Sequence, residues 1–172
     1  NNPFFDNIMW HISAHWFWIP VVLLFFYFSV KDYKSRAWLP ILFLILCFAF
    51  TDQTTTFFKN VFERYRPSHN LELEGLIHNI RGYKGGLYGF FSGHTSNSFG
   101  LMFLTSSIVA RKKYTMILVF WAIIVSYSRI YLGVHYPSDL LIGVVWGLSS
   151  GVIFYNLFKY VKWLVFRQNI QK

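Results

Sequence analysis

The sequence predicts an all-α fold, a polytopic bundle of about five to six membrane-spanning helices with a polar outer loop. Three observations predict it: 55% of the 172 residues are hydrophobic, only 13% are charged, and the apolar residues come in long blocks. A soluble domain usually carries about 25% charged residues. Helices are favoured because an open-ended segment inside a bilayer satisfies its backbone hydrogen bonds only as a helix. We expect residues 1–172 to form a single membrane-embedded domain.

Five segments are long and apolar enough to cross a bilayer, which takes about 20 helical residues. They are residues 14–30, 37–58, 92–110, 114–130 and 137–158. Asp52 is the only charged residue in the second segment, and a polar stretch, residues 59–87, follows it. Aromatic residues make up 22% of the chain and concentrate near the segment ends, which is typical of interfacial belts.

The basic loops predict the orientation. With five crossings, the loop KDYKSR, the sequence RKK after the third segment and the C-terminal tail all face one side. Their basic residues are Lys31, Lys34, Arg36, Arg111, Lys112, Lys113, Lys162, Arg167 and Lys172. The positive-inside rule makes that side cytoplasmic. The opposite side keeps a second set of cations, which indicates an anionic ligand there: Lys59, Arg64, Arg66, Arg81, Lys84 and Arg129.

Charge and cysteine content exclude several other classes. The net charge of +9 does not indicate nucleic acid binding, because the basic residues fall in short loops between apolar blocks. Cys47, the single cysteine, lies within LFLILCFAF, where we expect a buried hydrophobic residue rather than a reactive thiol. No cofactor or protein partner is implied. Because the first residue is Asn1 rather than Met, we expect the chain to begin inside a longer one.

Three polar clusters fall at the segment ends on the outer side. KNVFERYRP (Lys59–Pro67) follows the second segment, and the third begins within FSGHTS (Phe91–Ser96). The fourth segment ends and the fifth begins within SRIYLGVHYPSD (Ser128–Asp139). Topology alone therefore brings the three clusters to one depth on one face of the membrane.

The cations in these clusters suit a phosphate group. Lys59, Arg66 and Arg129 would place three fixed positive charges in one region. A guanidinium offers a planar fork of donors to phosphate oxygens, and an ammonium acts as a point charge. Ser92 and Gly93 begin a helix, where free N–H groups and the helix dipole favour an anion, and glycine permits close approach. We predict an oxyanion cradle for a phosphoryl group.

Two histidines and an aspartate supply the reactive groups. His135 precedes Tyr136 and Pro137, so it lies just before the helix that Pro137 begins. Asp139 falls in the first turn of that helix and can reach back to one ring nitrogen of His135, which leaves the other nitrogen free to attack phosphorus. His94 can donate a proton to the departing oxygen. The substrate predicted for this site is a lipid with an anionic head group.

The motifs K-x6-R-P (Lys59–Pro67), S-G-H (Ser92–His94) and S-R-x5-H-x3-D (Ser128–Asp139) resemble those of the type 2 phosphatidic acid phosphatase superfamily. The resemblance implies a helical-bundle membrane phosphatase that needs no metal. It implies that His135 forms a phosphohistidine, that Asp139 supports it, and that His94 is the acid. The implied phosphate binders are Lys59, Arg66, Ser92, Gly93 and Arg129.

The chain departs from the family pattern at Phe91, where the motif has proline. We expect a less constrained helix start and a bulky ring near the head-group pocket, which bears on substrate preference more than on the chemistry. The resemblance also places an N-terminal helix upstream of Asn1.

The function expected is that of an integral membrane hydrolase acting on a lipid phosphate at the periplasmic face of a bacterial inner membrane. Undecaprenyl diphosphate and phosphatidylglycerol phosphate are the favoured substrates, with phosphatidic acid and lipid A 1-phosphate as alternatives. A small transporter is the alternative from another class, but neither discontinuous helices nor paired halves are visible. The intact reactive set disfavours a silent lipid-binding protein, and membrane embedding disfavours vanadate-dependent haloperoxidase chemistry.

Polar residues within or beside the apolar segments have structural interpretations. His11 and His15 have the spacing of a metal or haem pair, but we expect interfacial histidines. Asp52 and the threonines at 54–56 resemble a polar pathway, and helix–helix hydrogen bonding is the favoured interpretation.

The outer loop carries further polar residues. Its acidic residues lack metal-ligand spacing: Glu63, Glu72 and Glu74. We expect His69 and His78 to be solvated. For Tyr83 and Lys84–Gly86, a flexible loop is the default and contact with the head group the alternative.

Overall fold

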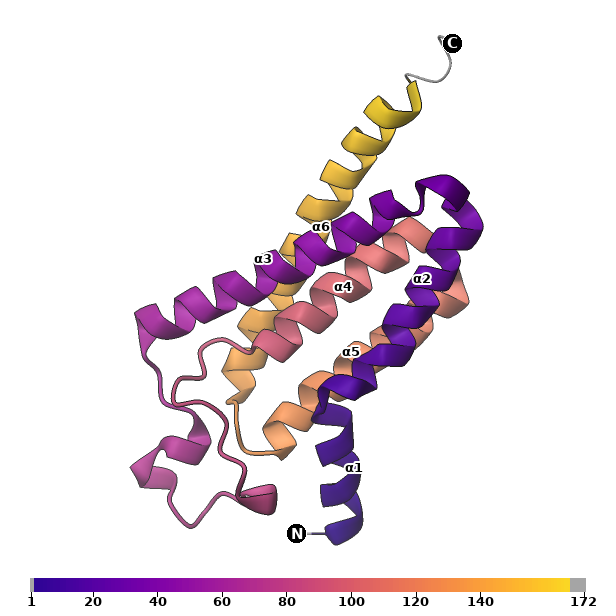
Figure 1. Cartoon of the computed structure of the whole chain (residues 1–172). Helices are drawn as coiled ribbons and strands as arrows, with labels where there is room; N and C mark the ends of the chain where they lie inside the picture. The colour runs from indigo at the N-terminus through magenta and orange to yellow at the C-terminus, as the bar shows by residue number, and fades with distance from the viewer. Residues whose placement is uncertain (1, 168–172) are drawn as a thin grey trace.

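The computed structural model describes residues 2–167 and consists mainly of α-helices (Figure 1). They are α1 (Pro3–Ser13), α2 (Ile19–Tyr33), α3 (Trp38–Phe62), α4 (Gly93–Val109), α5 (Lys112–Tyr131) and α6 (Pro137–Arg167). These residues contain no β-strand, and Tyr65 and Tyr88 form an isolated bridge in the outer loop. The predicted all-α bundle is confirmed.

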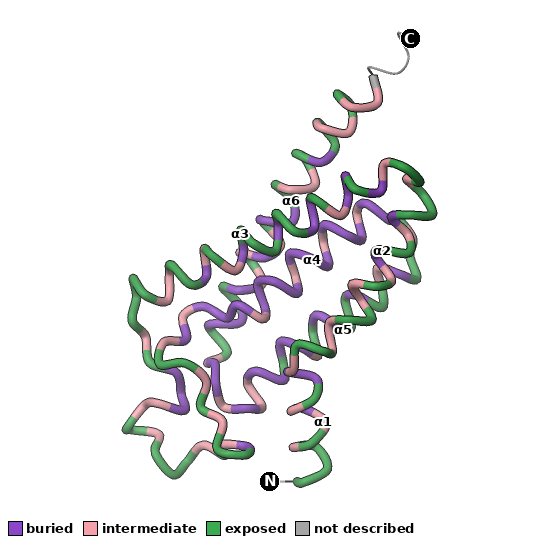
Figure 2. Tube along the Cα trace, in the orientation of Figure 1, coloured by how far each residue is buried: buried purple, intermediate pink, exposed green. Residues whose placement is uncertain are grey.

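Four stretches are long and apolar enough to span a bilayer. They are His15–Arg36, Trp38–Phe62, Lys112–Tyr131 and Pro137–Phe166. α4, the third predicted segment, is shorter at 17 residues and rich in Ser, Thr and Gly. Most of its residues are buried, because α3, α5 and α6 pack around it (Figure 2). A helix enclosed in this way needs no apolar surface toward lipid.

α4 and α6 approach each other closely through small residues. Gly143, Gly147 and Gly151 recur every four residues on the face of α6 toward α4. A Cβ atom at Gly147 would lie 3.0 Å from the backbone nitrogen of Gly100 and would also meet the backbone oxygen of Ser96. Small residues at this spacing let membrane helices pack backbone against backbone.

The close packing extends to the N-terminal ends of both helices. The backbone N–H of Ser92 donates to the carbonyl of Asp139 at 3.2 Å. A Cβ atom at Gly143 would lie 3.1 Å from the carbonyl oxygen of Ser92. The starts of α4 and α6 are therefore fixed against each other beside the outer loop.

The connections gather at two opposite ends of the bundle, as the alternation of segments predicts (Figure 1). The α2–α3 and α4–α5 turns lie together at one end, where Arg111 donates to both carboxylate oxygens of Asp32 at 2.6 and 2.8 Å. The α3–α4 and α5–α6 connections lie at the other end. Of the basic residues predicted for the first end, Lys172 and the side chain of Arg167 lie outside the described part of the chain.

The long helices extend further than the hydropathy predicts. α3 continues to Phe62 rather than ending at Phe58, so Lys59 lies in its last turns. α6 continues to Arg167 rather than ending at Phe158. Hydropathy marks where a segment leaves the hydrocarbon, and helical hydrogen bonding continues past that point.

α1 is a helix that the sequence analysis does not predict within the chain, since it places the N-terminal helix upstream of Asn1. Its start has local signals: the side chain of Asn2 accepts a hydrogen bond from the N–H of Phe4 at 3.0 Å, and Pro3 is the first helical residue. The first predicted segment is also interrupted, because a 3-10 turn (His15–Trp18) precedes α2.

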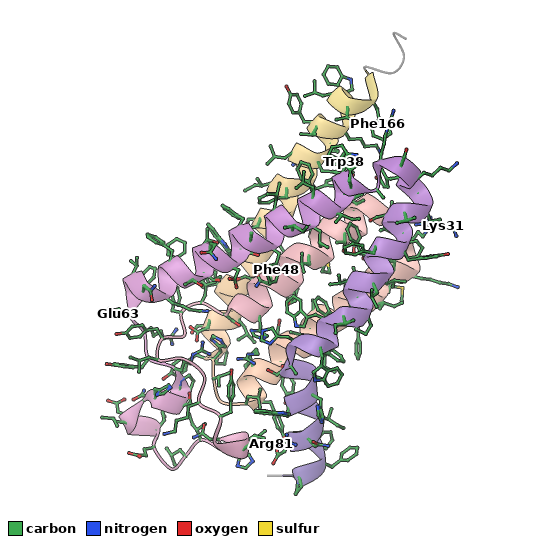
Figure 3. The ribbon with its side chains drawn as sticks, viewed as in Figure 1. Lys31, Trp38, Phe48, Glu63, Arg81 and Phe166 are labelled. Carbon is green, nitrogen blue, oxygen red and sulfur yellow. The ribbon has the colours of Figure 1, made fainter. Side chains whose placement is uncertain are left out.

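α1 and the outer loop, residues 63–92, hold each other in place. Asp6 binds the ring of His78 at 2.9 Å and accepts a hydrogen bond from the Tyr131 hydroxyl at 2.8 Å. Arg81 lies beside α1 and donates to Asn7 at 3.0 Å (Figure 3). Together they cover the outer ends of the central helices.

Cys47 has no exposed surface and lies on α3 in the main apolar core. Its sulfur would be 3.7 Å from a Cβ atom at Gly100. The expected buried, non-bonded cysteine is confirmed.

We expect Gly147→Ala to destabilise the protein by about 1–3 kcal/mol, the usual cost of overpacking a core. The new methyl group would meet backbone atoms of α4, which cannot rotate away as a side chain can. The free energy of unfolding in mixed micelles measures the loss. Gly86→Ala is the control, because a Cβ atom there has no neighbour within 4 Å. Equal stability of the two variants would contradict this account of the helix contact.

Candidate active site

A cavity of about 510 Å³ lies between α2, α3, α4, α5 and the outer loop. Its outer part has polar walls, formed by His15, Asp52, Lys59, Arg66, Tyr83, Gly93, His94, Asn97, Arg129 and His135. Its deeper part has mainly apolar walls, formed by Trp18, Val22, Leu44, Ile45, Phe48 and Leu101. A molecule with a polar head and an apolar tail fits this division.

Six of the eight site residues predicted from the sequence line this cavity: Lys59, Arg66, Gly93, His94, Arg129 and His135. The other two, Ser92 and Asp139, have no exposed surface and lie behind its wall. The structure therefore brings all three sequence motifs to one place, although they are contributed by separate helices and the outer loop.

Ser92 is the N-cap of α4 and not a free hydroxyl. Its Oγ accepts from the backbone N–H of Thr95 at 3.4 Å and from the Thr95 hydroxyl at 3.1 Å. Gly93 and His94 follow as the first two helical residues, whose N–H groups have no acceptor within a helix. The positive end of α4 therefore adjoins the cavity and favours an anion.

Gly93 leaves room beside the ammonium group of Lys59. A Cβ atom at Gly93 would lie 3.4 Å from Nζ of Lys59 and 3.3 Å from the hydroxyl oxygen of Thr55. The Lys59 side chain thus runs back along α3 to the start of α4.

Arg66 is buried and oriented by backbone groups on both sides of the site. Its Nε donates to the carbonyl of Tyr88 at 3.1 Å, and its Nη1 donates to the carbonyl of Val134 at 3.2 Å. The same Nη1 lies 3.1 Å from Nε2 of His135. Gly89 packs against its side chain, since a Cβ atom there would lie 3.0 Å from Cγ of Arg66. The guanidinium is thus fixed beside the imidazole.

Arg129 is 3% exposed and is held by residues outside the three motifs. It donates to the hydroxyl of Ser13 on α1, and its Nη2 is 3.5 Å from the hydroxyl of Tyr83 in the outer loop. The Tyr83 ring packs edge-on against Trp10 at a centroid distance of 5.5 Å. The helix and loop that cover the site therefore also orient its third cation.

None of the ion pairs found in the described residues involves Lys59, Arg66 or Arg129. Three cations converge on one cavity, and none of them is ion-paired with Asp52, a carboxylate that also lines it. Concentrating like charges in a low-dielectric site is unfavourable unless an anion binds there. The site is therefore built for a multiply charged anion.

Asp139 lies behind His135 and faces its other ring nitrogen. One carboxylate oxygen, Oδ2, is 3.5 Å from Nδ1 of His135 and accepts from the backbone N–H of Tyr136 at 3.0 Å. The other, Oδ1, accepts from Nη1 of Arg64 at 2.9 Å. Arg64 also donates to the Ser138 hydroxyl at 3.0 Å. The predicted first-turn position of Asp139 is confirmed, and Arg64 is its previously unrecognised partner.

These contacts select one form of the His135 ring. A guanidinium can only donate, so Nε2 facing Arg66 must carry a lone pair, and the proton belongs on Nδ1 toward Asp139. Burial, followed by the positive charges of Arg66, Arg129 and Lys59, holds the pKa of His135 well below its ordinary value of 6.5. A neutral imidazole therefore faces the cations with its unprotonated Nε2, which accepts from Arg66.

His94 lies at the start of α4 with aromatic neighbours from the N-terminal part of the chain. Its ring centroid is 5.6 Å from that of His15 and 6.1 Å from that of Trp18. No group of three or more His, Cys, Asp or Glu residues in the described chain, His11 and His15 included, is arranged to hold a metal ion.

Phe91 does not line the cavity. It is 3% exposed and packs among aromatic rings, with centroid distances of 5.7 Å to Phe58 and 5.9 Å to Trp146. The expectation of a bulky ring near the head group is wrong, because the side chain turns into the contact between α3 and α6. Tyr83, by contrast, lines the cavity, although the default expectation placed it in a flexible loop away from the head group.

The loop histidines differ from one another. His78 is exposed as expected but bonded to Asp6, and the ring of His69 is 3.4 Å from the carbonyl of Gly85. Asp52 forms the expected helix–helix hydrogen bond, accepting from the side-chain amide of Asn97 at 3.4 Å.

Sequence reasoning missed Arg64, Ser13 and His15 as parts of this site, and it gave contact of Tyr83 with the head group only as an alternative. Arg64 has a local signal, because it lies two residues before Arg66 and both fall in the chain that leaves α3. Ser13 and His15 have none, because their positions depend on how α1 folds back over the bundle.

Residues 40–163 match the sequence profile of the PAP2 superfamily. The chain belongs to this superfamily. It is 36% identical over 169 residues to the lipid A 4′-phosphatase of Porphyromonas gingivalis, an alignment that covers 95% of this chain and 71% of the relative. It is 32% identical over 158 residues to the lipid A 4′-phosphatase of Bacteroides thetaiotaomicron, covering 90% and 70%. The protein is a membrane lipid phosphatase, as the motifs predict.

Two solved structures share the fold. The PAP2-type phosphatidylglycerolphosphate phosphatase of Bacillus subtilis superposes with a TM-score of 0.69 and 23% identity, over 94% of this chain and 78% of that structure. Aquifex aeolicus LpxE gives a TM-score of 0.66 and 24% identity, over 91% and 88%. The helical bundle is thus common to PAP2 phosphatases of different bacteria.

We expect Arg64→Gln to lower kcat by about tenfold, as loss of a group that orients a reactive residue usually does. Without Arg64 the Asp139 carboxylate keeps only the Tyr136 N–H as a hydrogen-bond donor among the described residues and holds His135 less firmly. Phosphate release from a lipid phosphate measures the change. Lys84→Gln, in the same loop, is the control that removes a cation without touching Asp139. Equal kcat for the wild type and Arg64→Gln would exclude this positioning role.

Proposed function

We propose that this phosphatase hydrolyses a phosphate monoester of a lipid A-type glycolipid through a phosphohistidine formed on His135. The observation that carries the proposal is the convergence of three cations around the unprotonated Nε2 of His135. None of the three cations forms an ion pair with a carboxylate of the described residues. The apolar depth of the same cavity supports a lipid as the rest of the substrate.

The first step is attack by Nε2 of His135 on phosphorus, which forms the P–N bond as the P–O bond to the lipid breaks. Burial, followed by the positive charge of Arg129, holds the pKa of His94 well below its ordinary value of 6.5 in the free protein. The bound phosphoryl anion favours the protonated ring, which gives its proton to the departing oxygen. Lys59, Arg66, Arg129 and the N–H groups at the start of α4 stabilise the charge on the phosphoryl oxygens. Asp139 holds Nδ1–H of His135 and stabilises the positive ring as the bond forms.

The second step returns the enzyme to its starting state. A water molecule gives a proton to His94, now neutral, and its oxygen attacks phosphorus. The P–N bond breaks, inorganic phosphate leaves, and His94 is again protonated. The cycle uses no metal, which makes activity in EDTA a requirement of the proposal.

Lipid A is favoured as the substrate by the two lipid A 4′-phosphatases, each more than 30% identical to this chain. They favour it over the undecaprenyl diphosphate and phosphatidylglycerol phosphate that the sequence alone puts first. Lipid A carries phosphate on an acylated amino sugar, which suits a cavity that changes from polar to apolar walls over its depth. We infer that residues 1–172 act as one such domain in the inner membrane, with the cavity toward the periplasm, which the basic opposite end supports.

Replacing the nucleophile tests the chemistry. We expect His135→Ala to lower phosphate release from lipid A by a factor on the order of 10⁴ or more, and His94→Ala by about 10²–10⁴. Wild-type protein quenched in alkali during turnover of ³²P-labelled lipid should carry acid-labile label, and His135→Ala should carry none. His11→Ala is the matched control, since His11 is exposed and outside the cavity. Full activity of His135→Ala, or loss of wild-type activity in EDTA, would refute the mechanism.

The depressed pKa of His135 predicts a pH profile. The nucleophile must be neutral, so activity is lost as pH falls through the pKa of the folded protein. Because that pKa is lowered, the acid limb of kcat/KM should lie below 6.5. A phosphate monoester also titrates near about pH 6, so its own titration by ³¹P NMR must be subtracted. A corrected limb above 6.5 would contradict the proposed electrostatics.

A further inference from the structure

Asp52 is a carboxylate at membrane depth that the phosphoryl-transfer steps do not use. It lies near the middle of α3, lines the cavity, and forms none of the ion pairs found in the described chain. An ionisable side chain inside a membrane-spanning segment is costly to keep and usually marks a functional contact.

The position of Asp52 relative to the phosphate site is defined by α3. The hydroxyl of Thr55 and the ammonium of Lys59 both lie next to Gly93, which marks the level of the phosphate cations. Asp52 precedes Thr55 by three residues, so it lies about 4.5 Å deeper along the helix axis. It therefore occupies the boundary between the polar and apolar parts of the cavity.

Asn97 on α4 contacts Asp52 at this boundary. The hydroxyl of Thr51 donates to Oδ1 of Asn97, so the amide NH₂ of Asn97 faces Asp52. Its Nδ2 donates to Oδ1 of Asp52 at 3.4 Å, a long hydrogen bond. The second carboxylate oxygen has no hydrogen-bond donor among the described residues. Since Thr51 and Asn97 are 1% and 5% exposed, the pair is fixed by packing and retains capacity to accept a hydrogen bond.

We propose that Asp52 and Asn97 form a subsite that accepts a hydrogen bond from the amide N–H joining an acyl chain to an amino sugar. This inference rests on the proposed function. In such a lipid the amide lies where the sugar meets the acyl chain, one ring from the phosphate, which matches the place of Asp52 between the cations and the apolar wall. Isoprenyl and diacylglycerol phosphates have no donor there, so they would leave the carboxylate unpaired. Asp52 is thus a specificity-determining residue.

Two synthetic substrates isolate this hydrogen bond. Both are monosaccharide 4-phosphates with the same acyl chains, joined at position 2 by an amide in one and by an ester in the other. We expect the wild-type protein to favour the amide in kcat/KM by about tenfold or more, the usual effect of a hydrogen bond to a charged group. Asp52→Leu should remove this preference by lowering turnover of the amide by about tenfold more than turnover of the ester.

Two more variants keep the test decisive. Asp52→Asn preserves the side-chain volume and one acceptor oxygen, so it should fold and show an intermediate preference even where Asp52→Leu does not fold. Thr54→Val is the control, because the Thr54 hydroxyl accepts from Trp146 at 2.9 Å and lies outside the cavity. It should keep the full preference for the amide.

The outcomes separate the two proposals. Equal wild-type rates on amide and ester, or an equal fall on both substrates in Asp52→Asn, would overturn the subsite and leave the lipid A-type phosphatase standing. Wild-type activity toward an isoprenyl phosphate but toward neither sugar lipid would overturn the proposed substrate, and the subsite with it.

Discussion

The close contact between α4 and α6 is the constraint on which the rest of the structure depends. Glycines on α6 meet backbone atoms of α4, so the two helices cannot slide or separate without losing contact along several turns. The contact ends where Ser92 donates to the carbonyl of Asp139, which fixes the two helix starts beside His94 and His135. The polarity of α4 follows from the same constraint, because a central helix packed this closely is shielded from lipid.

The site gathers three positive charges in one cavity at the outer-loop end of the bundle, where Arg66 and Arg129 are buried. Arg66 and Arg129 are oriented by carbonyl and hydroxyl oxygens, and Lys59 forms none of the ion pairs found in the described residues, so their charge stays available to a bound anion. Asp139 lies on the far side of His135 and is held there by Arg64. The Asp139 carboxylate is therefore separated from the phosphate site by the imidazole that it polarises.

The sequence alone predicted those parts of the site that depend only on residue spacing and helix topology. The three motifs follow from residue type and segment alternation, and the first-turn position of Asp139 follows from Pro137. Contacts that depend on how distant elements fold together were not predictable. Ser13 reaches Arg129 only because α1 turns back over the bundle, and Phe91 leaves the pocket only because Phe58 and Trp146 offer it an aromatic niche. Tyr83 likewise reaches Arg129 from a position that its ring contact with Trp10 fixes.

The apolar wall of the cavity reaches the outside of the bundle between α2 and α3, since Ile45 and Phe48 line it yet are 56% and 41% exposed. A lipid can therefore arrive sideways from its own leaflet without leaving the hydrocarbon. Encounter then becomes a two-dimensional search, and the quantity that saturates the enzyme is the mole fraction of substrate in the membrane surface rather than its bulk concentration. The dephosphorylated lipid remains in the membrane surface and lowers the mole fraction of substrate there. Inorganic phosphate escapes to water, so the two products leave through different phases.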